Sequence, residues 1–156
     1  MSYNHPLNLI VHQAGSAIAA GCPVIVKPAE DTPLSCFSSV EILREAGLPE
    51  PWCQPVATRD LALAERLVTD PRVGFSSFIG SARVGWHLRS RLAPGTRCAL
   101  EHGGAAPVMV NDATAFRVEW MPFGGLRESG LGVGGIPYAF RDTQFEKLLV
   151  VRSRAL

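Results

Sequence analysis

The chain has 156 residues, the size of one ordinary domain and short for a two-domain enzyme. With 47% hydrophobic and 19% charged residues, its composition is that of a folded globular protein, not of a disordered chain. Lysine and arginine (15 residues) balance aspartate and glutamate (14 residues), so no basic excess indicates nucleic acid or an anionic membrane as a partner.

The first 47 residues alternate between helical and extended patterns. Apolar residues recur at helical spacing over 6–20 and stop at Gly21, a usual helix-ending residue. The β-branched run at 22–26 predicts a strand buried on both faces, as in a parallel sheet. Helical spacing then returns over 33–46 and ends at Gly47.

The same alternation continues to residue 100. A weak strand, a helix opening at Asp60, a strand, a helix and a strand are expected in turn, near 54–57, from 60, and over 73–78, 81–92 and 97–100. Strands and helices that alternate at this spacing predict an α/β fold with a doubly wound parallel sheet.

The pattern changes after residue 101. Repeated glycine pairs and few helix signals predict loops over most of the remaining chain. Residues 145–152 have an apolar body and charged ends, which predicts a terminal strand. We expect that strand to pair with an edge in the same chain or in the partner of a homodimer.

Neither a membrane segment nor a metal site is expected. The opening residues lack the basic flank and apolar core of a signal peptide, and no run reaches the 18 or so apolar residues of a membrane span. A cytoplasmic protein is therefore predicted. The four cysteines form no CxxC pair, which favours reduced structural thiols over disulfides or metal ligands.

Lys27 and Glu30 follow a predicted buried strand, in the segment VIVKPAEDTPLS. They therefore lie at the carboxyl edge of the sheet, where ligands bind in open α/β folds. An ammonium and a carboxylate there can donate to and accept from ribose hydroxyls. The alternative is a solvated turn fixed by Pro28 and Pro33.

Gly80 and Ser81 lie between a predicted strand and a predicted helix, in SSFIGSARVG. Glycine permits close backbone approach, serine is a good N-cap, and a helix N-terminus suits a phosphate. The segment is not a GxGxxG fingerprint, so a plainly capped helix is the alternative.

Glu101 and Asn4 are candidates for catalysis. Glu101 emerges from an apolar strand just before two glycines, where a carboxylate with a raised pKa can act as a general base. Asn4 carries an amide that can donate to a developing oxyanion. A structural role is the alternative for each.

Taken in order, five segments resemble the signature segments of the aldehyde dehydrogenase superfamily: SYNHPLNL, AAGCPVIVKPAEDTPLS, FIGSARVG, ALEHGGAAPV and MPFGGLRESGLG. The resemblance implies a Rossmann-like cofactor domain and NAD(P)-dependent oxidation of an aldehyde small-molecule substrate through a thiohemiacetal. Such chemistry uses a cysteine nucleophile, a glutamate base, and an asparagine with a backbone amide for the oxyanion.

The resemblance assigns roles to seven residues of this chain. It implies that Asn4 is the oxyanion donor and Glu101 the general base. The implied NAD-binding set comprises two ligands of the adenosine ribose and three residues of the turn and helix under the pyrophosphate: Lys27 and Glu30, then Gly80, Ser81 and Gly85. An acidic residue at the position of Glu30 favours NAD over NADP.

The sequence departs from the family pattern at two places. The Gly-Gln-x-Cys nucleophile motif and the Glu-Ile-Phe-Gly-Pro motif are absent between residue 108 and the segment that resembles the family's C-terminus. Cys98 does not replace the nucleophile, because residues 98 and 101 of a strand face opposite sides. At the amino end, the strand that runs through the middle of the family's sheet is missing.

We therefore divide the chain into a partial Rossmann-like NAD(P)-binding domain at 1–108 and a C-terminal loop and strand segment at 109–156. The first functional hypothesis is a cofactor-binding remnant that binds NAD or AMP weakly and does not oxidise ordinary aldehydes. The second is an enzyme of non-redox chemistry, such as cyclisation, hydration or isomerisation, with Glu101, Asn4, His5 or His102 in a pocket between subunits. The third is a decayed or truncated reading frame, either a non-catalytic binding module or one piece of a split enzyme whose partner supplies the cysteine domain.

Overall fold

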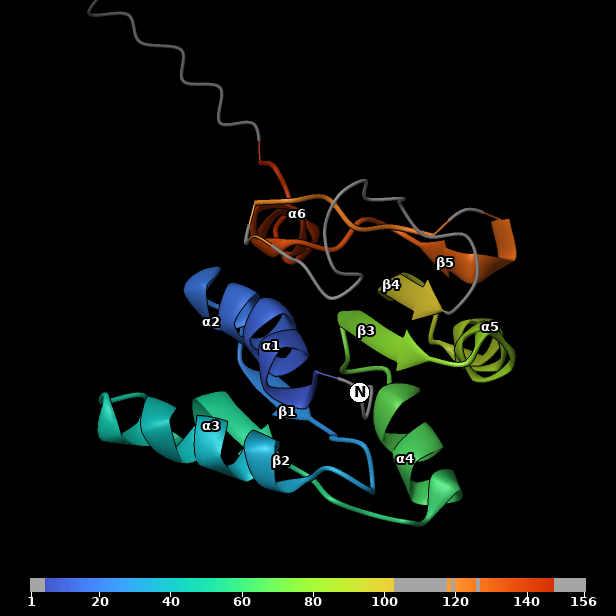
Figure 1. Ribbon diagram of the computed structural model, residues 1–156. Coiled ribbons are helices and arrows are strands. Elements are labelled where there is room, and N and C mark those ends of the chain that lie inside the picture. The colour runs from blue at the N-terminus through green and yellow to red at the C-terminus, as the bar shows by residue number, and fades with distance from the viewer. Residues whose placement is uncertain (1–4, 103–117, 119, 126, 148–156) are drawn as a thin grey trace, which may run out of the picture.

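The computed structural model describes residues 5–102, 118, 120–125 and 127–147 (Figure 1). Its helical elements are α1 (Pro6–Ile10), the π-helical η1 (Val11–Gly15), α2 (Ser16–Ala19), α3 (Leu34–Glu45), η2 (Glu50–Trp52), α4 (Leu61–Val68), α5 (Ala82–Arg91), η3 (Arg127–Ser129) and α6 (Ile136–Asp142). Its strands are β1 (Val24–Val26), β2 (Cys53–Pro55), β3 (Phe75–Gly80), β4 (Arg97–His102) and β5 (Gly130–Leu131).

The strand and helix alternation predicted up to residue 100 is confirmed. The expected helix at 6–20 is α1, η1 and α2 in succession, and it ends at Gly21, whose φ of 81° suits a residue without a Cβ. Helix α4 begins after Asp60, whose side chain accepts hydrogen bonds from the amides of Ala62 and Leu63. The chain thus has the α/β fold that its periodicity indicates.

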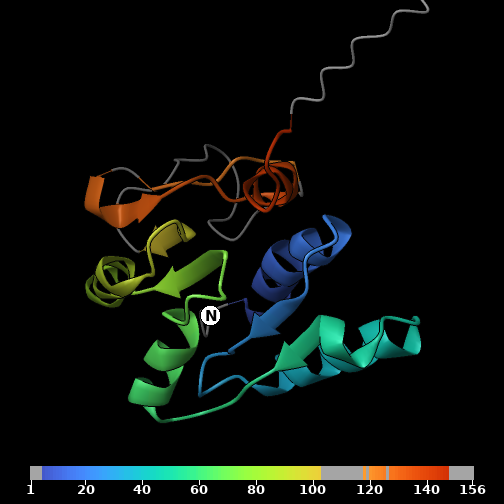
Figure 2. The same ribbon diagram turned by 180° about the vertical axis from the view of Figure 1, so that it is seen from behind.

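The described strands form two sheets, not one. Strand β1 pairs with β2 in parallel, and β3 pairs with β4 in parallel, while the short β5 runs antiparallel to β4. Both views place β1 and β3 on either side of the break between the sheets (Figures 1 and 2).

The largest hydrophobic cluster lies between the first sheet and the helices packed on it. Its buried members come from the first helical segment, α3, β1 and β2: Ile10, Ala14, Val26, Cys36, Val40 and Cys53. The prediction that β1 is buried on both faces is wrong, since Ile25 is 52% exposed while Val26 is 3% exposed. The reason is that the described helices cover only the face that carries Val26.

The described part of the C-terminal region contains three short elements, η3, β5 and α6, where loops were expected. Strand β5 pairs with β4, and helix α6 packs against α2 and η1. Residues 145–147, the start of the predicted terminal strand, are described and are not in a strand, while 148–152 lie outside the described residues. Among the described helices, none is long and apolar enough to cross a membrane.

Candidate functional site

Lys27 and Glu30 form an ion pair in the turn after β1. The Nζ atom of Lys27 lies 2.9 Å from Oε1 of Glu30 and also donates to the carbonyl of Pro28 at 3.1 Å. The hydrogen bond from Lys27 and its positive charge lower the pKa of the Glu30 carboxyl. Both predicted ribose ligands therefore lie together, charged and partly exposed, at the carboxyl end of β1.

A pocket of about 190 Å³ lies beside this ion pair. Its walls come from the turn after β1 and from the residues that follow β2: Pro28, Ala29, Glu30, Pro33, Ala57, Thr58 and Arg59. The two walls meet because β1 and β2 are parallel neighbours, and the amide of Val56 donates to the carbonyl of Val26 at 2.9 Å. Since pockets for whole drug-sized ligands span about 300–1,000 Å³, this pocket suits one part of a larger ligand.

Sequence reasoning missed the second wall of the pocket. Thr58 and Arg59 belong to no motif that we singled out. A signal was nevertheless present, because parallel strands end at one edge of a sheet, so residues following β2 must lie near those following β1.

The turn between β3 and α5 has the predicted cap. The Oγ atom of Ser81 accepts a hydrogen bond from the amide of Val84 at 3.4 Å, so the helix starts at Ala82. A Cβ atom on Gly80 would lie 2.6 Å from the Phe78 ring, and one on Gly85 would collide with the His102 ring. The glycines therefore leave room for two aromatic rings, and the turn does not line the pocket beside Lys27.

Glu101 is half-buried in β4, opposite Ile79 of β3 and Gly130 of β5. The C-terminal region lies against its carboxylate, because a Cβ atom on Gly134 would be only 2.6 Å from Oε1. Gly134 is itself fixed by paired backbone hydrogen bonds with Phe123. Asn4, the predicted oxyanion donor, lies outside the described residues, so its distance from Glu101 is not defined.

His102 packs among aromatic rings. Its ring lies 5.6 Å from that of Trp86 and 6.1 Å from that of Phe78, and its Nδ1 is 3.1 Å from the carbonyl oxygen of Glu128. Glu101 and His102 are adjacent in a strand, so their side chains face opposite sides of the sheet. His5 is exposed at the start of α1, and the described residues do not gather it with Glu101 and His102 in one pocket.

None of the four cysteines forms a disulfide. Burial raises the pKa of Cys36 to about 11, and burial also raises the pKa of Cys53 and of Cys98. These thiols are therefore protonated at neutral pH and are poor nucleophiles. Cys98 also lies on the face of β4 opposite to Glu101, as strand alternation predicts.

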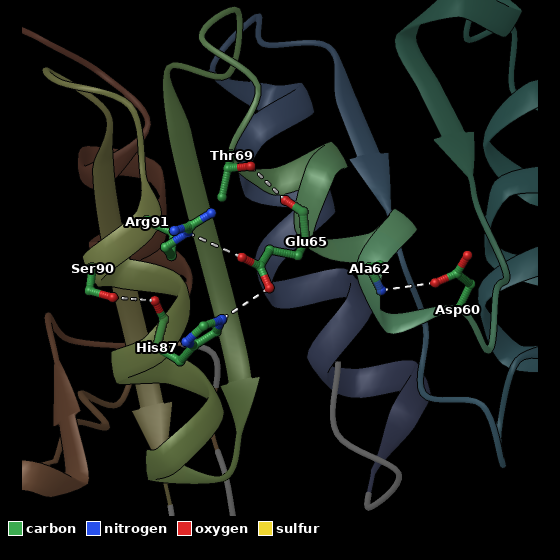
Figure 3. A network of polar contacts seen from close by, with 7 residues as sticks. All are labelled: Asp60, Ala62, Glu65, Thr69, His87, Ser90 and Arg91. Carbon is green, nitrogen blue, oxygen red and sulfur yellow. Dashed lines mark hydrogen bonds and ion pairs between the residues drawn. The ribbon is translucent and has the colours of Figure 1, made fainter.

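A polar network joins helices α4 and α5 (Figure 3). Glu65 accepts from His87 through Oε2 at 3.0 Å and pairs with Arg91 through Oε1 at 3.3 Å. The hydrogen bond from His87 is the main reason that the pKa of Glu65 is lowered. The network fixes the two helices to each other, since a single carboxylate on α4 binds two side chains of α5.

The part of the chain that is similar to known proteins includes the pocket beside Lys27 and the turn before α5. The aldehyde dehydrogenase family model matches residues 1–114. The non-phosphorylating aspartate-semialdehyde dehydrogenase of Halomonas elongata is 41% identical over 109 residues, which are 69% of this chain and 22% of that protein. The mitochondrial succinate-semialdehyde dehydrogenase of Arabidopsis thaliana is 38% identical over 111 residues, 70% of this chain and 21% of that protein.

Solved structures show the same likeness. An NADP-dependent enzyme of E. coli superposes with a TM-score of 0.63 at 36% identity, over 68% of this chain and 22% of that one. Lactaldehyde dehydrogenase from Escherichia coli gives a TM-score of 0.63 at 31% identity, with the same two coverages. The chain thus spans about a fifth of the length of these relatives. It is a partial member of the aldehyde dehydrogenase family.

Proposed function

We propose that this chain is an adenine-dinucleotide-binding fragment of an aldehyde dehydrogenase, which holds the adenosine end of NAD(P). The observation that carries the proposal is the pocket at the carboxyl edge of β1 and β2, with the Lys27–Glu30 ion pair beside it. In open α/β folds this edge is where nucleotides bind. The pocket is small and open to solvent, so it would contact only one end of the dinucleotide.

The charged pair has the donors and acceptors that a ribose needs. The Glu30 carboxylate is ionised at neutral pH, as Lys27 lowers a pKa that is already acidic, so it can accept hydrogen bonds from ribose hydroxyls. The Lys27 ammonium donates to Glu30 and to the carbonyl of Pro28, and so holds the Glu30 carboxylate in place beside the pocket. The Ser81-capped start of α5 would then take the pyrophosphate, since a helix N-terminus attracts anions.

We propose that this chain alone does not oxidise aldehydes. The family's chemistry needs a cysteine thiolate beside the glutamate base. Cys36, Cys53 and Cys98 have raised pKa values, and Cys98 faces away from Glu101. The proposal also includes a cytoplasmic location and a homodimer joined through residues 145–152, which stay predictions.

Calorimetric titration with 5′-AMP and with NAD tests the binding proposal. We expect weak binding, detectable at millimolar ligand, and about a tenfold loss of affinity in Glu30→Ala, because the variant removes a charged hydrogen-bond acceptor. Glu41→Ala on the exposed face of α3 is the matched control and should bind as the parent chain does. Absence of binding by folded protein would remove the proposal.

A second assay tests the lack of oxidation. Incubation with NAD and succinate semialdehyde should give no NADH absorbance above a blank without protein. Steady NADH production by the pure chain would show that a nucleophile is present after all.

A further inference from the structure

We propose that the C-terminal region closes over the carboxylate of Glu101 as an autoinhibitory strap. The strap, defined as residues 121–125 and 130–135, fills the space in front of the carboxylate with backbone. A small molecule that is to exchange a proton with Glu101 must therefore wait for the strap to open. This inference does not depend on the nucleotide pocket, which lies at the edge of the other sheet.

The strap follows the face of β4 that bears Glu101. Ala99 and Glu101 share that face, because side chains alternate along a strand. Strand β5 brings the strap to this place, since Gly130 pairs with Glu101. A Cβ atom on Gly132 would lie 3.4 Å from the Cβ of Ala99, and two residues later one on Gly134 would lie 2.6 Å from a carboxylate oxygen. The strap thus covers Ala99 and then Glu101.

Glycines allow the strap to lie this close to β4. A Cβ atom on Gly130 would be only 2.5 Å from the carbonyl oxygen of Leu100, so a side chain there would push the strap away. Backbone hydrogen bonds in both directions join Gly134 to Phe123 in the other part of the strap. These bonds hold Gly134 in its place against the carboxylate.

The strap occupies the space that a reactant needs. A general base takes a proton from a donor atom about 2.6–3.2 Å away. On the side of Gly134 a single added carbon atom would already lie within that distance of Oε1 of Glu101, so no room is left there for a reacting atom. A closed strap therefore keeps ligands from this side of the carboxylate, and an open strap admits them.

Carboxyl labelling of the full chain tests the strap. A water-soluble carbodiimide with glycine ethyl ester converts accessible carboxylates into amides, and peptide mass spectrometry gives a rate for each residue. We expect Glu101 to be labelled about tenfold more slowly than Glu41, which is exposed on α3, because labelling of Glu101 requires local opening. Equal rates for the two residues in folded protein would overturn the proposal.

Two alanine variants should remove the protection. Gly134→Ala places a methyl group against the Glu101 carboxylate, and Gly130→Ala places one against β4. Neither glycine has a positive φ, so alanine tests the space alone. Both variants should raise the labelling rate of Glu101 about tenfold, whereas Gly74→Ala, with no atom within 4 Å of its methyl group, should leave it unchanged. Folded variants that keep the slow rate would show that the strap is not the shield.

A measurement on the parent chain decides the question even if neither variant folds. Urea below the unfolding transition should raise the labelling of Glu101 and the hydrogen exchange of the Gly134 amide together, because one opening exposes both. Labelling of Glu41 should stay constant. A rise in one without the other, or in neither before the chain unfolds, would overturn the proposal.

Discussion

The two sheets of this molecule are stabilised in different ways. Around β1 and β2, helices α1, η1 and α3 enclose a continuous cluster of small and medium apolar side chains. Around β3, β4 and β5, Leu100 is the one fully buried hydrophobic residue among those that the structure describes. The second sheet depends instead on aromatic packing around His102 and on ion pairs between α4 and α5.

This difference in packing separates the surroundings of the pocket from those of Glu101. The pocket beside Lys27 and Glu30 stands on the sheet with the packed core, so its walls are held by apolar burial. Glu101 stands on the other sheet, with Gly134 against its carboxylate. The pocket and Glu101 thus stand on two sheets that are packed in different ways.

The largest effect should come from the core of the first sheet. Ile10→Ala should lower the free energy of unfolding by about 3 kcal/mol, because it leaves a cavity in a packed cluster. Ile25→Ala is the matched control: its side chain lies on the exposed face of β1, and the loss should stay below about 1 kcal/mol. Urea unfolding of both variants measures the difference. Equal losses would show that the exposed face of β1 is covered in solution.

A smaller effect is expected in the second sheet. Gly85→Ala should cost about 2 kcal/mol, because the new methyl group would collide with the His102 ring and force it to move. Gly74→Ala is the control, since no atom lies within 4 Å of the added methyl and its cost should be near zero. In a Gly85→Ala, His102→Ala double variant the two losses should not add, because the collision disappears. Additive losses in urea unfolding would argue against ring packing as the role of Gly85.

The sequence predicts the order of strands and helices up to residue 100 because local signals agree there. Periodicity, the Asp60 and Ser81 caps and the glycines at helix ends all indicate the same helices, while the strands β2 and β3 lie one to two residues from their expected positions. Helix α6 was missed because it has only seven residues, begins beside a glycine and a proline, and is held by packing on α2. Tertiary contacts of that kind leave little trace in a local pattern.

One wall of the candidate site was predictable from the sequence and the other was not. Lys27 and Glu30 are three residues apart at the end of one strand, so their proximity follows from the local sequence. Arg59 is 29 residues beyond Glu30, and it reaches the pocket only because β1 and β2 pair in parallel. The exposure of Ile25 was not predictable, since a β-branched run does not reveal which face of its strand is covered.

The smallest effect concerns the network between α4 and α5, and it depends on pH. The folded pKa of Glu65 lies below its ordinary value of 4.5, mainly through the hydrogen bond from His87. A carboxyl group with a lowered folded pKa binds its proton more readily in the unfolded chain. It therefore stabilises the fold above its unfolded pKa, and that stabilisation is lost as the pH falls through its folded pKa.

Thermal unfolding between pH 7 and pH 3 measures this contribution. The melting temperature of the parent chain should fall more steeply below about pH 4.5 than that of Glu65→Gln, which cannot titrate at this position. Glu41→Gln, on the exposed face of α3, should follow the parent curve, since no described ion pair uses that residue. Because the network is exposed, 1 M salt should bring the parent and Glu65→Gln curves together. Parallel curves at low salt would mean that the contacts of Glu65 with His87 and Arg91 add nothing to the stability of the second sheet, leaving the aromatic packing around His102 as its main support.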